Sequence, residues 1–332
     1  MNKTYKQDNP IESEVDFDAD GFHKGYLRLP WSSDRSAYGW LPIPIACAKN
    51  GNGPRVLLLA GNHGDEYEGQ VVLSELMRIL DIERVNGQII IAPAINAPAA
   101  FAHGRTSPID GGNLNRLFPG NPAGQPTQMI ADYVENVLLA KADYMLDLHS
   151  GGQSLEYVQT ALLTREPDET RNGRKTEILA SLGTPYGLWF PGDANSVYSS
   201  SAALRQGVLS VTVETGGGGQ LAQETVDAAR AVTYRFLRAT GVYDKPGICY
   251  EVPAPRVFHQ ALYTYANCGG LFEPLVSPGD EVQAGQPAAL IHQVERPAAA
   301  PLEIVFENAG TVLCKRSIAP VVTGDCLYQL GT

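Results

Sequence analysis

Hydrophobic residues in the first 240 positions form short continuous runs that alternate with stretches of helical spacing. The run PRVLLLAG at 54–61 is typical of a strand buried on both faces. Apolar residues then recur at helical spacing over 66–80, and the turn signal VNG leads to a second buried strand within 88–96. This order predicts a strand–helix–strand unit with parallel strands.

The same alternation continues and predicts an α/β fold with a mixed, mostly parallel sheet flanked by helices. Two extended stretches near the N-terminus, 23–30 and 38–51, are expected to pair at an edge of this sheet. Further strands are predicted at 144–149 and 208–215, and further helices at 127–142, 174–183, 201–207 and 223–241.

The pattern changes after the KPG segment at 245–247, which places a larger α/β domain at 1–244 and a smaller all-β domain at 248–332. Short β-like runs divided by Gly and Pro follow this point. Residues 276–291 resemble the repeat of lipoyl- and biotinyl-type barrels. Those carriers present a modifiable lysine, and no lysine occurs between Ile248 and Leu313, which argues against a carrier role.

Composition excludes several classes of protein. The chain has 332 residues, 44% hydrophobic and 18% charged, with a net charge of -11 and no Lys/Arg cluster, so nucleic-acid binding is not expected. No apolar run approaches the roughly 18 residues of a membrane span, and the polar, acidic N-terminus is unlike a secretory signal. A cytoplasmic location is expected, and homo-oligomerisation is left open.

Cysteine usage agrees with a reducing compartment. The five cysteines are odd in number and show no CxxC spacing. We therefore expect them to be buried apolar thiols. Their positions are Cys47, Cys249, Cys268, Cys314 and Cys326.

Four residues at the ends of predicted strands point to a metal site. His63 and Glu66 follow the first buried strand, His149 ends the strand at 144–149, and Glu214 ends the strand at 208–215. Hydrolytic zinc takes three N or O ligands and keeps a position for water, so the first three residues predict one zinc ion per chain. Glu214 would be the base that such a water needs. Taken singly, the HxxE pair is a weak signal and is more typical of a solvated helix start than of a metal site.

Two nearby features support this interpretation. Asp147 lies two residues before His149, so both side chains point to the same side of a strand, and Asp147 could orient a zinc-bound imidazole from behind. Its alternative role is that of a turn or capping aspartate. The loop at 103–127 is long, lacks evident secondary structure and contains Arg and Asn residues, which favours a functional loop.

Four motifs together, GNHGDEYEG, NLNRLFPG, DLHSGG and VETGGGG, resemble the succinylglutamate desuccinylase/aspartoacylase family of the zinc carboxypeptidase-like superfamily. Within that family they look most similar to the N-acetyl-diaminobutyrate deacetylases of ectoine degradation. The resemblance implies a zinc carboxypeptidase-like fold. It also implies that His63, Glu66 and His149 bind zinc and that Glu214 is the general base and proton shuttle.

The same resemblance assigns roles to three loop residues. Arg105 matches the arginine that polarises the scissile carbonyl, and Asn115 and Arg116 match the pair that holds the substrate's α-carboxylate. A planar guanidinium suits bidentate binding of a carboxylate. The alternative is that both arginines are surface charges of the loop.

These observations predict a zinc-dependent amidohydrolase that deacylates a small N-acyl amino acid, for example N-acetyl-2,4-diaminobutyrate. The alternatives are a zinc carboxypeptidase acting on peptides and a non-catalytic binding or sensing protein. The resemblance implies that the β domain narrows access to the zinc, which would exclude polypeptides. For the rest of the substrate, the segment 190–207 offers Asp193, Tyr198 and Arg205, and no spacing argument selects among them.

Overall fold

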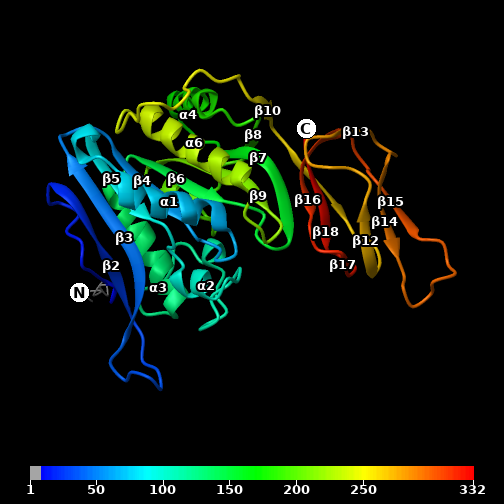
Figure 1. Ribbon diagram of the computed structural model, residues 1–332, viewed down its shortest axis with the longest axis horizontal. Helices are drawn as coiled ribbons and strands as arrows, with labels where there is room; N and C mark the ends of the chain where they lie inside the picture. The colour runs from blue at the N-terminus through cyan, green and yellow to red at the C-terminus, as the bar shows by residue number, and fades with distance from the viewer. Residues whose placement is uncertain (1–8) are drawn as a thin grey trace, which may run out of the picture.

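A large mixed sheet flanked by helices dominates the computed structural model, which describes residues 9–332 (Figure 1). Its centre consists of parallel strands in the order β5-β4-β6-β9. Their bounds are β4 Arg55–Ala60, β5 Gly87–Ala92, β6 Tyr144–His149 and β9 Leu209–Gly217. The apolar runs that predicted buried strands therefore form the middle of the sheet, which confirms the expected fold class.

Helices cover both faces of this sheet. One face carries α1 (Tyr67–Ile79), α4 (Glu169–Leu182) and α6 (Gln223–Thr240). The other carries α2 (Ala97–Phe101), α3 (Pro126–Tyr133) and α5 (Ser199–Arg205). A π-helical turn at Val134–Leu138 and 3₁₀ turns at Leu139–Lys141, Ile82–Arg84 and Leu114–Arg116 complete the helical segments of this part.

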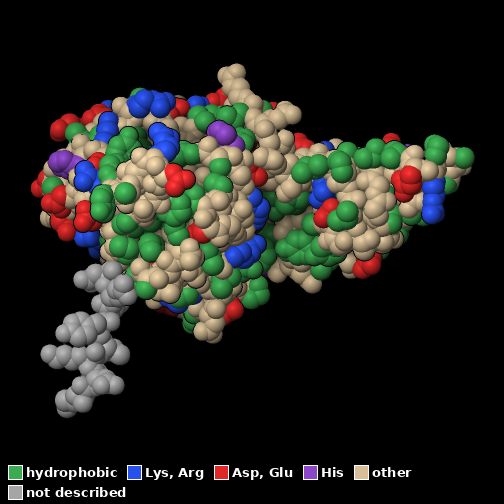
Figure 2. Space-filling view, turned by 90° about the horizontal axis from the view of Figure 1, so that it is seen from below, with side chains coloured by type: hydrophobic (Ala, Val, Ile, Leu, Met, Phe, Trp, Pro, Cys, Tyr) green, Lys and Arg blue, Asp and Glu red, His purple; other side chains and the backbone are tan. Residues whose placement is uncertain are grey.

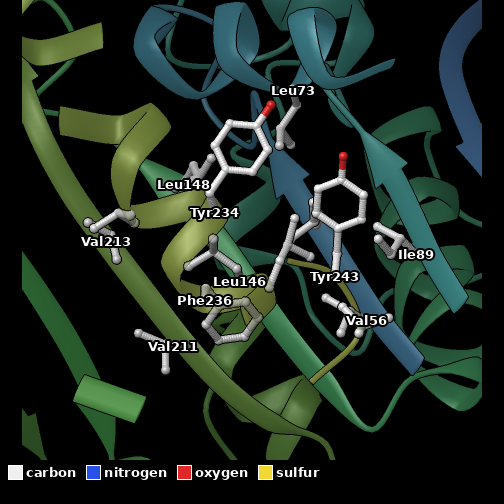
Figure 3. Packing of buried hydrophobic residues seen from close by; sticks show 14 of the residues in the cluster. Val56, Leu73, Ile89, Leu146, Leu148, Val211, Val213, Tyr234, Phe236 and Tyr243 are labelled. Atoms are coloured by element: carbon white, nitrogen blue, oxygen red, sulfur yellow. The ribbon is translucent and has the colours of Figure 1, made fainter. Parts of the chain in front are cut away.

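The two faces are held by two separate hydrophobic clusters. Along β4, Val56 and Leu58 point to the α1/α4/α6 side and Leu57 and Leu59 to the other, which is the period-2 alternation of a strand. Figure 3 shows Tyr234, Phe236 and Tyr243 packed with core side chains of the strands in the first cluster, which include Leu146, Leu148, Val211 and Val213. Each fully buried side chain of this size contributes about 1.5–3 kcal/mol, so the central strands are firmly positioned.

The N-terminal strands form an antiparallel edge, as expected. β2 (Gly21–Pro30) pairs along its length with β3 (Trp40–Asn50), and β3 pairs with β5. The short β1 (Glu12–Ser13) adds to the outer side of β2.

Three further strands lie beyond β9 on the other side. β7 (Leu155–Thr164) runs antiparallel to β9, and β8 (Tyr186–Phe190) and β10 (Arg256–Phe258) continue in parallel with β7. Gly217, at the end of β9, has φ +122, and a Cβ there would lie 2.3 Å from the carbonyl oxygen of Leu155. The glycine run after Glu214 thus permits close approach of β7 to the end of β9.

The C-terminal region is all-β, as the sequence predicts. Its strands are β11 (Ala261–Tyr265), β12 (Gly270–Pro274), β13 (Glu281–Val282), β14 (Pro287–His292), β15 (Leu302–Val305), β16 (Gly310–Arg316), β17 (Pro320–Val321) and β18 (Cys326–Gly331). β16, β18 and β11 join the main sheet through pairing of β16 with β7, and β15-β14-β12-β17 form a second sheet. Figure 2 shows this region projecting from the larger body as a narrower extension. The division at 244–248 stays a prediction.

Two further sequence expectations concern membrane-spanning segments and the cysteines. None of the helices in residues 9–332 combines the length and apolar character needed to span a membrane.

The five cysteines are all free, but Cys249 is exposed rather than buried, because it lies in an irregular connection between α6 and β10. Cys47 and Cys314 are buried as expected, and Cys268 and Cys326 are half-buried.

Candidate metal and substrate site

The site lies at the carboxyl ends of the central parallel strands, where open α/β sheets place ligands. His63 and Glu66 lie in the loop between β4 and α1, and His149 is the last residue of β6. Glu214 on β9 is the register partner of His149. Gly64 lets this loop pack closely, since a Cβ there would lie 2.0 Å from the backbone of Ala99 in α2.

His63, Glu66 and His149 form a compact buried triad. The Nδ1 atom of His63 lies 2.6 Å from Oε1 of Glu66, and Nδ1 of His149 lies 2.8 Å from Oε2 of the same carboxylate. One ligand atom from each residue lies within 4.8 Å of the others, and each residue is buried. The sequence-predicted ligands are therefore brought together around one point.

The outer nitrogens of both imidazoles face oxygen atoms. Nε2 of His63 is hydrogen-bonded to Oδ1 of Asn113 at 3.1 Å, and Nε2 of His149 lies 3.1 Å from Oδ2 of Asp147. Oxygen acceptors at these positions favour a proton on Nε2, so that Nδ1 of each ring could serve as the metal ligand. Two imidazole nitrogens and a carboxylate in this arrangement fit a zinc ion.

The pKa shifts at the triad follow from its charges. Burial raises the pKa of Glu66, but the neighbouring His63 and His149 outweigh it and lower the pKa well below its usual range. Burial lowers the pKa of His149, and the carboxylates of Asp147 and Glu66 raise it well above its usual value. The carboxylates of Glu66 and Asp147, whose pKa values are both lowered, thus stay ionised, and this part of the site favours positive charge.

Glu214 has a different environment. Burial, the dominant cause, raises the pKa of Glu214 to about 8, and the charge of Glu66 adds to that increase. Its Oε2 atom is shielded from solvent and has no hydrogen-bond partner among residues 9–332. A carboxyl group whose pKa lies near neutrality is suited to accept and release a proton.

All of these groups open into one cavity of about 420 Å³. It is lined by the triad, Glu214, Arg105, Asn115 and Arg116, so every metal, base and substrate residue predicted from the sequence reaches it. Asp147 is buried behind His149 and does not line the cavity. The structure therefore places it where a residue orienting the imidazole would lie.

Arg105 lies close to the triad. Its Nη1 atom is 3.6 Å from Oε1 of Glu66 and 3.4 Å from Nδ1 of His63. The side chain is 44% exposed, so it reaches from the loop surface over the triad. A cation at this position could stabilise negative charge that develops next to the metal.

Asn115 and Arg116 lie together on the 3₁₀ turn at Leu114–Arg116. Oδ1 of Asn115 accepts a hydrogen bond of 2.9 Å from the backbone N–H of Ser199, and Arg116 donates to the carbonyl oxygen of Asn115 at 2.9 Å. The guanidinium of Arg116 lies 4.8 Å from the ring centroid of Tyr198. No ion pair in the described part of the chain engages Arg116, which leaves its charge available to a ligand.

The segment 190–207 offered three candidates for contact with the rest of the substrate, and the structure distinguishes two that line the cavity from one that does not. Asp193 and Tyr198 line the cavity. Arg205 instead makes two 2.8 Å hydrogen bonds to the carboxylate of Glu135 and also donates to the carbonyl of Ser196. It therefore holds the loop in place rather than facing a ligand.

Sequence reasoning missed several residues of the site. Asn113 contacts His63 without lining the cavity, and its place in the NLNR motif was the available signal. Ser199 and Tyr157 have no comparable pattern around them. Tyr263 and Gln329 come from β11 and β18, and the Nε2 of Gln329 donates to the Tyr263 hydroxyl at 3.0 Å. The C-terminal strands therefore supply part of the cavity wall.

Comparison with known proteins identifies the family of this chain. Residues 52–240 match the family model of the succinylglutamate desuccinylase/aspartoacylase catalytic domain. The N-alpha-acetyl-L-2,4-diaminobutyric acid deacetylase of Halomonas elongata is 40% identical over 97% of this chain and 95% of its own length.

Solved structures give the same picture. The product-bound ectoine utilization protein EutE (DoeB) from Ruegeria pomeroyi superimposes with a TM-score of 0.93 at 35% identity, covering 98% of this chain and all of that one. A succinylglutamate desuccinylase from Silicibacter sp. TM1040 gives a TM-score of 0.92 at 35% identity, covering 98% of this chain and 99% of its own. This chain belongs to the succinylglutamate desuccinylase/aspartoacylase family.

Proposed function

We propose that this protein is a zinc-dependent deacylase that hydrolyses the amide bond of a small N-acyl amino acid, with N-acetyl-2,4-diaminobutyrate as the leading substrate. The observation that carries the proposal is the His63–Glu66–His149 triad with Glu214 in the same cavity. Identity of 40% to a diaminobutyric acid deacetylase over nearly the whole chain supports the choice of substrate. A cytoplasmic location is part of the same proposal.

The residues divide the reaction among them. Zinc, when bound by the triad, supplies a Lewis acid that acidifies water and polarises the amide carbonyl. Glu214 accepts the proton of the attacking water and returns it to the amine that leaves. Arg105 stabilises the negative charge that develops on the carbonyl oxygen.

The substrate's α-carboxylate is assigned to Asn115 and Arg116. Because Oδ1 of Asn115 already accepts from Ser199, its Nδ2 group remains to donate to a ligand. The planar guanidinium of Arg116 adds two parallel N–H donors, which match the two oxygens of a carboxylate. Both side chains line the cavity beside the triad.

The second amine of a diamino acid is assigned to Asp193. Besides the carboxylates of Glu66 and Glu214, Asp193 is the remaining acidic side chain of the cavity lining in residues 9–332. Glu66 is paired with the two histidines, and Glu214 is assigned to proton transfer. Asp193 is therefore the group available to pair with a substrate ammonium.

Cavity size favours this proposal over a peptidase acting on long chains. The space of about 420 Å³ is lined in part by Tyr263 and Gln329 of the C-terminal strands. Pockets of this size hold small ligands.

The test is to measure the metal content of the purified protein and amine release from N-acetyl, N-succinyl and N-formyl amino acids, with peptides and α-amides included. We expect about one zinc per chain, turnover of N-acetyl-2,4-diaminobutyrate that a chelator abolishes, and poor turnover when the α-carboxylate is amidated. Metal-free protein that binds ligands without hydrolysing them would favour a sensing protein, and preferential cleavage of peptides would favour a carboxypeptidase.

A further inference from the structure

The first turn of α5 contacts both halves of the site. Ser199 is buried, and its Oγ donates a 2.6 Å hydrogen bond to Oδ2 of Asp147. Its backbone N–H donates a 2.9 Å hydrogen bond to Oδ1 of Asn115. One residue thus touches the carboxylate behind a metal ligand and the amide assigned to the substrate.

The hydroxyl contact acts on the metal side. Oδ2 of Asp147 lies 3.1 Å from Nε2 of His149, whose Nδ1 lies 2.8 Å from Glu66. A short O–H···O⁻ hydrogen bond is charge-assisted and fixes the direction of the carboxylate. Ser199 therefore holds Asp147 where it can orient His149, with Nδ1 directed at the triad.

The backbone contact acts on the substrate side. A side-chain amide offers one oxygen acceptor and two N–H donors. Because the N–H of Ser199 occupies the acceptor, the orientation of Asn115 that presents its donors to the cavity is favoured. The adjacent Tyr198 ring, 4.8 Å from the Arg116 guanidinium, supports the second member of the pair.

We infer that Ser199 is a positioning residue that joins the metal site to the α-carboxylate pair, with its hydroxyl setting metal affinity through Asp147 and its N–H setting the orientation of Asn115. The substrate half of this inference rests on the proposed function. The metal half rests on the triad and its contacts.

The test is Ser199→Ala, which removes the hydroxyl and keeps the backbone N–H. Zinc affinity of the apo-protein, measured by competition with a chromogenic chelator, should fall about 10–100-fold, as for other partners of metal-bound histidines. At saturating zinc, KM for a substrate with a free carboxylate should stay near the wild-type value, because the Asn115 contact remains. Thr233→Val is the control, since it removes a buried hydroxyl whose 2.8 Å hydrogen bond to Ala229 lies within α6.

A double-mutant cycle separates positioning from general loss of structure. If Ser199 acts through Asp147, the losses of zinc affinity in Ser199→Ala and Asp147→Asn should not add in the double variant. Additive losses, wild-type affinity in Ser199→Ala or an equal loss in Thr233→Val would overturn the inference.

Because the competition assay needs no substrate, the outcomes for Ser199 and for the proposed function are distinguishable. A protein that shows the Ser199 effect but hydrolyses no acylamino acid would refute only the proposed function. A wild-type protein that binds no zinc would overturn both.

Discussion

Glu214 differs from Glu66 because it faces the cavity with no histidine or arginine among residues 9–332 hydrogen-bonded to it. Burial raises its pKa to about 8, whereas Glu66 is held ionised by two imidazoles. At the scale of single residues, the neighbours of these two carboxylates thus suit them to different roles in one cavity.

Replacing Glu214 with Gln should separate metal binding from turnover. We expect kcat to fall by about 10²–10⁴-fold, because general-base catalysis contributes about that much, while zinc content is unchanged. Steady-state kinetics together with metal analysis measure both. Glu177→Gln on the exposed face of α4 is the matched control and should keep wild-type kinetics. An active Glu214→Gln enzyme would exclude the assigned base.

Asp193 should decide recognition of the second amine. In Asp193→Asn, KM for N-acetyl-2,4-diaminobutyrate should rise about five- to tenfold, since a partly exposed charged contact is worth about 1 kcal/mol. N-acetyl-2-aminobutyrate lacks that amine, so its KM should not change. Parallel increases for both substrates would show that Asp193 shapes the loop instead of binding an ammonium group.

The candidate metal ligands and the candidate base, which sequence alone identified, share one property. His63, Glu66, His149 and Glu214 follow apolar runs, so the strand pattern itself places them at one edge of the sheet. Ser199 has no such signal, because its role arises from contacts with residues 52 and 84 positions away. Side chains that act through distant partners cannot be found from local spacing.

At the scale of elements, the connection between β7 and α4 depends on a buried ion pair. Glu166 follows β7, and its carboxylate lies 2.8 Å from Nζ of Lys175 on α4 and contacts Arg171. Lys175 also donates to the carbonyl of Thr164 at 2.7 Å. This cluster fixes the end of a strand that lines the cavity.

Glu166→Gln should lower the free energy of unfolding by about 3 kcal/mol at pH 7, since it leaves the buried ammonium of Lys175 without its partner. Burial raises the pKa of Glu166, but Arg171 and Lys175 outweigh it and lower the pKa below 4.5. The ion pair therefore stabilises the fold fully above that pH, and its contribution is lost as the pH falls through the folded-state pKa.

Urea unfolding of wild type and variant at several pH values measures this difference. The difference in free energy of unfolding between wild type and variant should become smaller below about pH 4.5. Glu177→Gln, which removes an exposed surface pair, should change stability by less than about 0.5 kcal/mol. A gap that is constant with pH would show that Glu166 stabilises the fold by packing alone.

Prediction of the elements succeeded where periodicity was strong. The β4–α1–β5 unit and the helix at 223–241 were recognised from apolar spacing. β7 and β8 were not predicted, because β7 mixes polar and apolar residues and β8 has only five residues. Their place in the sheet depends on pairing between distant segments, which local patterns do not encode.

At the scale of the whole molecule, the C-terminal strands take part in the site. Tyr263 lines the cavity and is held by Gln329. Tyr263→Ala should widen the cavity, so the ratio of kcat/KM for longer acyl groups over acetyl should rise about tenfold.

A series of N-acyl diaminobutyrates of increasing chain length measures this ratio. Tyr265→Ala on the same strand is the control, because Tyr265 is exposed and does not line the cavity. An unchanged acyl preference in Tyr263→Ala would place this wall away from the acyl group.

Pairing of β16 with β7 also has a consequence for the integrity of the protein. The main sheet is continuous here because β16 pairs in antiparallel fashion with Leu155, Glu156 and Tyr157 of β7. A proteolytic cut in the connection around residues 244–248, followed by loss of the C-terminal fragment, would uncover this stretch of backbone donors and acceptors. Such unprotected edges recruit strands from other molecules. The C-terminal region therefore covers an edge of the larger part of the chain that could otherwise lead to aggregation, and it also forms part of the cavity wall.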